Sequence, residues 1–236
     1  MQACLVNKSW LLKCYLFARQ MIDNTNSDLV MRRVPKEIYL NTFEGKVGEV
    51  GVYLYIRKHF PTISCSEPDF TISPRSIWDA GDLIINNVKV DVKSINEKSG
   101  FFMIETKRFL ENGEYSYKNN DGKDVDIEAY IVAKVIGNPI PYRDIPSIEP
   151  EEYFKDKPYT VKILGGISRD QFWKQKHFLP KGTKCNRINL KAACEGRPLE
   201  TVGYNADNKH NAVQTDNYVL DAYRELMDMT KVLNIE

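Results

Sequence analysis

Apolar residues recur at helical spacing in two segments near the start of the chain, 9–22 and 43–59. Spacing of three and four residues predicts a helix in each segment, and the second helix is expected to end at Phe60-Pro61. The apolar positions of this second helix fall on two sides rather than one. Such a helix is expected to be buried against more than one element, which places Glu49 on an inner face.

Five short apolar segments further along the chain predict β-strands: 82–85, 88–93, 100–106, 129–136 and 159–167. Residues 217–231 return to helical periodicity and predict a C-terminal helix. Two stretches interrupt the pattern, the polar 111–126 and the proline-rich, acidic 137–158, and both are expected to be surface insertions. Because no repeat or linker divides the chain, residues 1–236 are predicted to form a single α/β domain.

The composition is that of a globular protein, with 42% hydrophobic residues and a net charge of +1, and it excludes a disordered chain. Because the net charge is near zero, nucleic-acid binding would depend on a local basic cluster. Five cysteines without a Cys-x-x-Cys pair favour reduced thiols in a cytoplasmic protein. The three histidines are too scattered along the sequence to suggest a zinc cluster. No apolar run reaches the ~20 residues of a membrane span, so no membrane partner is expected.

Residues 82–93 (DLIINNVKVDVK) carry the most informative pattern in the chain. The Asn-Asn pair at 86–87 predicts a two-residue hairpin turn, because asparagine tolerates the positive φ angles that such a turn needs. This turn sets the register, so Asp82 is expected to face Asp91 on the next strand. Side chains alternate along a strand; one face of the hairpin is then wholly apolar, and the other receives Asp82, Asp91 and Lys93 together.

Two carboxylates that face each other across a β-ladder repel, and a divalent cation between them would offset the repulsion. Mg²⁺ is the favoured cofactor, with Mn²⁺ as a substitute, because Mg²⁺ takes few carboxylates, keeps several waters and completes its octahedron with phosphate oxygens. Lys93 lies about 7 Å along the same face from Asp91 by strand rise. There it would help to orient or deprotonate an attacking water and would offset charge in the transition state.

Asp82, followed by the tripeptide 91–93 (DVK) on the next strand, resembles the two-part signature of the PD-(D/E)XK nuclease superfamily. That superfamily includes many restriction endonucleases and DNA-repair nucleases. The segment 45–49 (GKVGE) resembles the upstream helix whose glutamate completes the metal site in many members. The resemblance covers residues 41–107 and, more weakly, 159–180. It implies a restriction-endonuclease-like α/β/α core, with a central mixed β-sheet flanked by helices.

The resemblance also implies a role for each matching residue. Asp82 and Asp91 would be catalytic metal ligands, and the Val92 carbonyl would be a further ligand. Lys93 would be the catalytic lysine. Glu49 would be the helical carboxylate, which takes part in catalysis and in metal binding.

Two of these assignments have competitors in the sequence. Glu44 is a second candidate for the helical carboxylate, although Glu49 is preferred because it directly follows a glycine. Asp79 would replace Asp82 if the first strand began earlier, which the hairpin register argues against. Ala80-Gly81 departs from the signature, because a proline often stands there, but that proline varies widely in the superfamily.

Residues 168–187 combine many basic side chains with interleaved aromatic residues and a single acid. Phosphates attract such a cluster, and aromatic rings stack on bases. The predicted DNA-binding residues are Arg169, Lys174, Lys176, Lys181, Lys184 and Arg187. The alternative interpretation is a helix with core aromatics on one face and solvated lysines on the other.

Together these features predict a magnesium-dependent DNA endonuclease. The leading interpretation is a type II restriction enzyme, which would act as a homodimer because a palindromic site presents the same half-site twice. One alternative is a phage or cellular repair, recombination or structure-specific nuclease with the same core. Another is a non-catalytic nucleic-acid-binding module. The sequence fixes neither the recognition site nor a preference for DNA over RNA.

Overall fold

The computed structural model describes residues 2–25, 34–72, 82–97, 99–114, 126–202 and 212–235. Its strands are β1 (Gln2–Val6), β2 (Leu83–Ile85), β3 (Val88–Asn96), β4 (Phe101–Glu105), β5 (Ala129–Ile136), β6 (Tyr159–Ser168), β7 (His177–Leu179) and β8 (Asn217–Asp221). Its helices are α1 (Lys8–Thr25), α2 (Pro35–His59), α3 (Pro150–Tyr153), α4 (Arg169–Gln175), α5 (Arg187–Cys194) and α6 (Met229–Val232), with 3-10 turns η2 (Thr106–Arg108) and η3 (Tyr142–Asp144).

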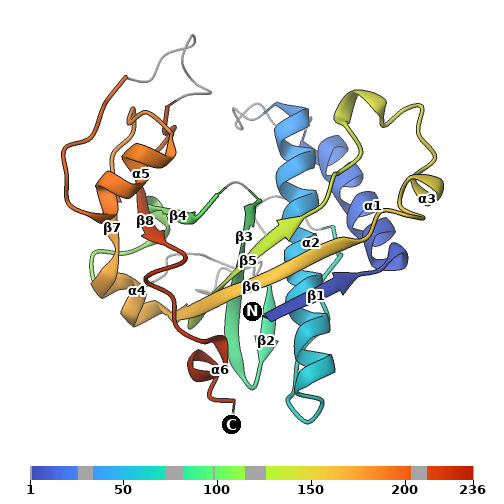
Figure 1. The fold of residues 1–236 in the computed structure, drawn as a ribbon, viewed down its shortest axis with the longest axis horizontal. Coiled ribbons are helices and arrows are strands. Elements are labelled where there is room, and N and C mark those ends of the chain that lie inside the picture. Colours follow the sequence, from blue (N-terminus) through green and yellow to red (C-terminus); the bar gives the residue numbers. More distant parts are fainter. Residues whose placement is uncertain are drawn as a thin grey trace.

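The strands form two sheets (Figure 1). The large sheet has the order β1-β6-β5-β3-β2, in which β3 and β5 are parallel and every other neighbouring pair is antiparallel. The small sheet has the order β4-β8-β7 and is antiparallel. The predicted α/β fold with a central mixed sheet flanked by helices is therefore confirmed. We call β4, β7, β8 and α5 the small lobe.

The β2–β3 hairpin forms as the sequence predicts. Asn86 and Asn87 have φ angles of 50° and 63°, which is the left-handed pair that a two-residue turn of this kind requires. The ladder then pairs three positions on each strand, from Ile85 with Val88 to Leu83 with Val90. The apolar face of the hairpin is buried in the main core.

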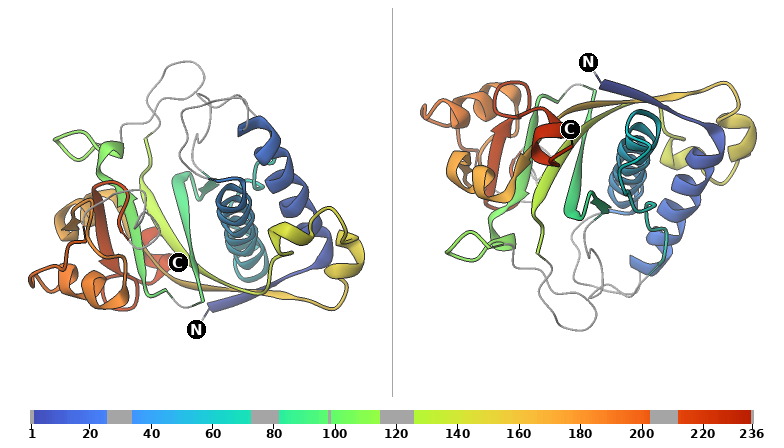
Figure 2. Two further views of the ribbon diagram at one scale, coloured as in Figure 1. Left: turned by 90° about the horizontal axis from the view of Figure 1, so that it is seen from above. Right: turned by 90° about the horizontal axis from the view of Figure 1, so that it is seen from below.

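Helix α2 packs directly on that apolar face and is itself covered by α1 (Figure 2). Two glycines allow the close approach to the sheet. A Cβ atom added at Gly48 would lie 1.9 Å from Ser94 Oγ on β3, and one added at Gly51 would lie 2.4 Å from Val161 on β6. The helix begins at Pro35, earlier than predicted, because a proline fits the first turn of a helix.

The opposite face of the large sheet packs against the small lobe and α4. Here the expected C-terminal helix at 217–231 is wrong, because its first part is β8, the central strand of the small sheet. The consecutive residues Val219 and Leu220 are both fully buried, but in two different cores. A strand that is buried on both faces has no polar alternation, so its apolar residues do not show the two-residue period that would indicate a strand.

The segment 137–158 is mostly exposed, as expected of an insertion, but three of its apolar residues anchor it in the main core. Ile140, Ile145 and Phe154 are buried there, and the Phe154 ring stacks on Phe43 of α2 with centroids 5.9 Å apart. Of the other predicted insertion, 111–126, residues 115–125 lie outside the described residues.

Three smaller features complete the fold. The chain begins with β1, an unpredicted edge strand that pairs with β6. All five cysteines are free. Within the described residues, every helix is too short or too polar to cross a lipid bilayer.

The close packing of α2 predicts opposite effects for two glycine substitutions in this helix. Gly51→Ala is expected to lower the free energy of unfolding by about 1–3 kcal/mol, because the new methyl group overlaps Val161. Gly45→Ala is the matched control, since a Cβ there meets nothing within 4 Å; it should raise the free energy of unfolding by about 0.5–1 kcal/mol. Urea denaturation measures both, and equal stabilisation by the two variants would contradict the packing described.

Candidate active site

Asp82 lies where β2 separates from β3. The regular ladder ends at Leu83, and the Asp82 amide donates to the Val90 carbonyl at 3.0 Å. The Asp82 Oδ2 atom accepts a hydrogen bond of 2.6 Å from the Val92 amide. The Asp82 carboxylate therefore occupies the edge of β3 beside Val92, instead of forming a regular ladder pair with Asp91.

Asp91 and Lys93 lie together on the face of β3 that points away from α2. The Lys93 Nζ atom is 2.6 Å from Asp91 Oδ2. Asp91 is 8% exposed, whereas the Lys93 side chain is 29% exposed. A carboxylate at this depth needs a charged or hydrogen-bonding partner, and Lys93 supplies one. The structure thus brings two of the predicted catalytic residues into direct contact.

Glu49 is buried on α2, 6% exposed, and its carboxylate lies 2.6 Å from the Lys46 ammonium. The pKa of the buried Cys14 thiol on α1 is raised, first by burial and then by the negative charge of Glu49. These contacts place Glu49 near the α1–α2 interface. The competing residue Glu44 has a pKa raised by burial, and Asp79 lies outside the described residues.

The three predicted carboxylates do not form one tight cluster. Among the residues that the structure describes, Glu49, Asp82 and Asp91 do not make a group whose ligand atoms all lie within 4.8 Å of one another. Asp82 and the Asp91–Lys93 pair converge on the same stretch of β3, whereas the recorded ion pair of Glu49 is with Lys46. The role of Glu49 as a metal ligand stays a prediction.

The donors around β3 fit a small hard cation. The N–H and C=O groups of one strand residue point to the same edge, so the Val92 carbonyl points to the edge that the Asp82 carboxylate occupies. Asp82, Asp91 and Val92 therefore offer oxygen atoms only. Oxygen ligands with few carboxylates are the set that Mg²⁺ prefers.

The predicted DNA-binding residues are spread from α4, through the segments on either side of β7, to the first residue of α5. Arg169 forms an ion pair with Asp126, and Lys184 forms one with Glu200 at 2.9 Å. The Lys176 ammonium lies 3.3 Å from the centre of the Trp173 ring. Lys174, Lys181 and Arg187 are exposed.

The aromatic residues of this segment belong mainly to the core. Phe172 is fully buried, whereas Phe178 is 55% exposed. Trp173 packs against Phe109 and Tyr218. The alternative interpretation of this segment, a helix whose aromatic side chains belong to the core, therefore accounts for Phe172 and Trp173. A surface hollow of about 330 Å³ lies beside α4, lined by Asn112, Gly113, Glu114, Arg169, Asp170, Trp173 and Lys174.

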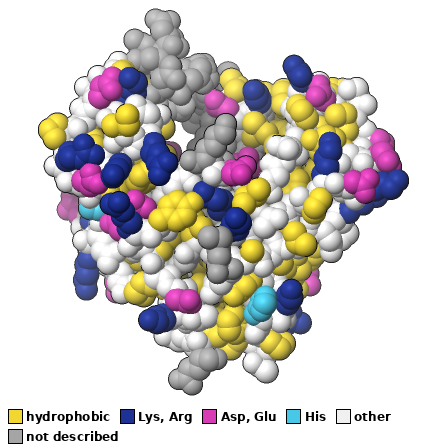
Figure 3. Space-filling view, viewed as in Figure 1, with side chains coloured by type: hydrophobic (Ala, Val, Ile, Leu, Met, Phe, Trp, Pro, Cys, Tyr) yellow, Lys and Arg dark blue, Asp and Glu magenta, His cyan; other side chains and the backbone are white. Residues whose placement is uncertain are grey.

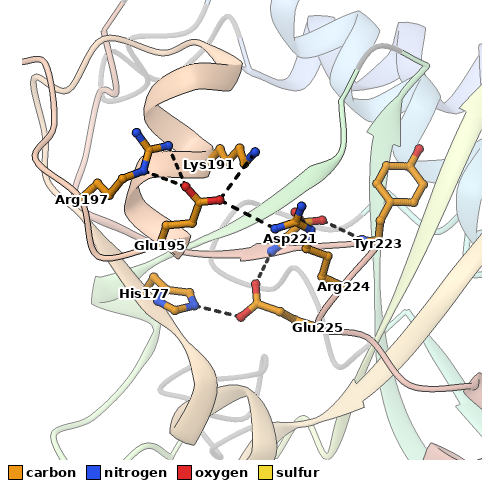
Figure 4. Close-up of polar contacts among 8 residues, drawn as sticks. All are labelled: His177, Lys191, Glu195, Arg197, Asp221, Tyr223, Arg224 and Glu225. Atoms are coloured by element: carbon orange, nitrogen blue, oxygen red, sulfur yellow. Dashed lines mark hydrogen bonds and ion pairs between the residues drawn. The ribbon is translucent and has the colours of Figure 1, made fainter.

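The structure also assembles a group that the sequence did not predict, His177, Cys194 and Glu225. Their ligand atoms all lie within 4.8 Å of one another. Figure 4 shows the contact between His177 and Glu225. Burial, followed by the negative charges of Glu225 and Asp221, raises the pKa of the Cys194 thiol to about 12. The scattered sequence positions of the histidines give no indication of this group. No sequence motif connects these residues, because folding alone brings them together.

Comparison with known proteins gives no relative. No family model matches the chain, and searches of curated proteins and of solved structures return no significant match. The function is therefore argued from the geometry of the chain itself.

The burial of the Lys46–Glu49 pair predicts a strong dependence of stability on Glu49. Glu49→Ala is expected to lower the free energy of unfolding by about 3–5 kcal/mol, because it leaves the charge of a lysine that is only 14% exposed without this carboxylate. Glu152→Ala is the matched control: Glu152 forms an exposed pair of the same spacing with Lys155, and its loss should cost less than about 1 kcal/mol. Urea denaturation compares the two, and similar losses would contradict a buried ion pair.

Proposed function

We propose that this protein is a magnesium-dependent nuclease that hydrolyses phosphodiester bonds in DNA. The observation that carries the proposal is the convergence of the Asp82 carboxylate and the Asp91–Lys93 pair at the open end of the β2–β3 hairpin. An oxygen-rich position beside an ammonium group suits a phosphate ester, whose charge increases at the non-bridging oxygens as it reacts. The resemblance of these residues to the PD-(D/E)XK signature supports the same reaction.

The residues that would hold Mg²⁺ are Asp82 and Asp91, through their carboxylates, and Val92, through its carbonyl. When bound, the metal lowers the pKa of a coordinated water and neutralises developing negative charge. Asp82 keeps its carboxylate in place through the hydrogen bond from the Val92 amide. A ligand that is fixed in this way costs little reorganisation when a cation binds.

Lys93 is the residue placed to act on the substrate. Its ammonium lies next to Asp91 and its side chain reaches solvent, so it is accessible to a phosphate group. There its ammonium would orient the attacking water, stabilise the charge of the transition state and donate a proton from Nζ to the leaving oxygen.

DNA binding is proposed to involve the small lobe and α4. Figure 3 shows Lys and Arg side chains over this part of the molecule, mixed with acidic ones. Lys174, Lys181 and Arg187 are exposed, which suits contacts with phosphates. Within this class we propose a type II restriction enzyme that acts as a homodimer. Discrete fragments from a defined plasmid would support that role, whereas cleavage of only branched or nicked DNA would favour a repair nuclease.

The proposed reaction predicts that two single substitutions abolish cleavage. Asp91→Asn and Lys93→Ala should each lower the rate at which Mg²⁺ promotes nicking or linearisation of plasmid DNA by about 100-fold or more. Lys89→Ala is the matched control, because Lys89 is an exposed lysine on the same strand, and it should cut like the wild type. Equal loss in all three variants would argue against a specific site, and DNA binding without any cutting by the wild type would favour a non-catalytic module.

Metal binding gives a separate prediction that does not need a known substrate. At 100 times its dissociation constant, Mg²⁺ should stabilise the wild-type fold by about 2.7 kcal/mol, because the proposed ligands are held beside the same stretch of β3 only in the folded chain. Asp91→Asn should lose most of this stabilisation, whereas Lys89→Ala should retain it. Thermal unfolding at increasing Mg²⁺ concentration measures the effect. If the unfolding midpoint of Asp91→Asn rose as much as that of the wild type, the ion would bind elsewhere.

A further inference from the structure

His177, Cys194 and Glu225 converge from three separate segments of the small lobe, and Figure 4 shows two of them, His177 and Glu225. His177 begins β7, Cys194 ends α5, and Glu225 lies in the turn that follows β8. The His177 Nε2 atom is 2.9 Å from Glu225 Oε1, and Cys194 is hydrogen-bonded to Glu225. All three residues are partly buried, so water has access to the group without surrounding it.

The arrangement does not match a cysteine nucleophile that is activated by histidine. In such a site the histidine stands between the thiol and the carboxylate. Here the carboxylate contacts both other groups. Glu225 is itself fixed, because its Oε2 atom accepts a hydrogen bond of 2.6 Å from the Asp221 amide. The group is therefore a set of three ligand atoms around a shared centre rather than a proton relay.

We propose that His177, Cys194 and Glu225 form a binding site for a zinc-like divalent transition metal, separate from the proposed magnesium site. A thiolate, an imidazole and a carboxylate are the ligand types that Zn²⁺ takes in proteins, whereas Mg²⁺ takes oxygen ligands. When the metal binds, the Cys194 thiol would release its proton to solvent and become a thiolate. With neutral imidazole and one negative charge each from the thiolate and the carboxylate, the charges of a bound dication are then balanced. Three protein ligands leave a fourth tetrahedral position for water.

The distances suit such an ion with small adjustments. Zn²⁺ bonds of roughly 2.0–2.3 Å in a tetrahedron separate ligand atoms by about 3.3–3.8 Å. The ligand atoms here all lie within 4.8 Å of one another. The His177–Glu225 contact would open slightly from its present 2.9 Å, which a change of side-chain torsion provides.

The site has a structural purpose in the small lobe. Among the described residues, the core between β7, β8 and α5 contains only a few buried apolar side chains: Phe101, Leu179, Leu190, Ala193, Val213 and Val219. Small cores often depend on a metal or a disulfide for stability. An ion held by the three ligands would tie β7, α5 and the turn after β8 together, and its binding free energy would stabilise the folded lobe.

The test begins with the full-length protein, freed of metal by a chelator and then titrated with Zn²⁺ and with Co²⁺. We expect one Zn²⁺ to bind per chain in competition with a chromophoric chelator, with an increase in the midpoint of thermal unfolding. Co²⁺ should produce the charge-transfer absorption of a cobalt–thiolate bond, which only a cysteine ligand gives. Absence of Zn²⁺ binding, or a Co²⁺ spectrum without the thiolate band, would overturn the proposal whatever the behaviour of any variant.

Single substitutions then identify the ligands. Cys194→Ser should remove the thiolate band, and Cys194→Ser, His177→Asn and Glu225→Gln should each weaken Zn²⁺ binding by about 100-fold or more, beyond the 10–100-fold typical of residues that only support ligands. Cys185→Ser and Glu195→Gln are the matched controls, because Cys185 is an exposed cysteine just before α5 and Glu195 is an exposed acid next to Cys194. Both controls should bind Zn²⁺ like the wild type, and loss in either one would overturn the assignment.

One further variant separates this site from the proposed nuclease site. Asp91→Asn should bind Zn²⁺ with unchanged affinity, because Asp91 lies on β3 of the large sheet. If Asp91→Asn instead abolished Zn²⁺ binding, the ion would belong to the β2–β3 hairpin and the present proposal would be wrong. Failure to cut DNA would leave this result unaffected, so the two proposals fail independently.

Discussion

The two-residue turn at Asn86-Asn87 determines on which side of the large sheet each side chain of the β2–β3 hairpin lies. Both asparagines adopt positive φ angles, and the tight turn leaves one register for the strands that it joins. A shift by one residue would place Asp91 against α2 and move Val92 to the other face. The buried packing of α2 makes that exchange very costly, so the turn and the core enforce the same arrangement.

That local constraint explains why the hairpin could be predicted from the sequence. The turn residues, the strand alternation and the apolar face all follow from neighbours in the chain, and the large-sheet strands β5 and β6 are likewise continuous apolar segments. The juxtaposition of Asp91 and Lys93 follows from their spacing alone. The offset of Asp82 does not, because the ladder of β2 with β3 already ends at Leu83, and the alternation of side chains does not indicate where a ladder ends.

The remaining features depend on contacts between distant segments. Strand β8 was mistaken for a helix because it lies between two cores, and only tertiary structure reveals the second one. The segment 137–158 has the composition of a surface loop, yet a few of its apolar residues anchor it beside α2. The His177, Cys194 and Glu225 group is the extreme case. Its members have no common motif, so the sequence contains no local signal for it.

One face of β3 carries the side chains of its odd-numbered residues, and this face is exposed to solvent near the turn and buried in a core at the far end. Lys89 near the turn is exposed, whereas Ile95 at the far end is 7% exposed and packs with residues of the small lobe such as Phe102 and Leu220. Asp91 and Lys93 occupy the boundary between these two environments. At that depth the carboxylate is partly desolvated, which strengthens its attraction for a cation, while the lysine beside it still reaches solvent. The Asp91–Lys93 pair thus differs from an ordinary exposed ion pair, which contributes little to stability, because the sheet face on which it lies is buried at Ile95.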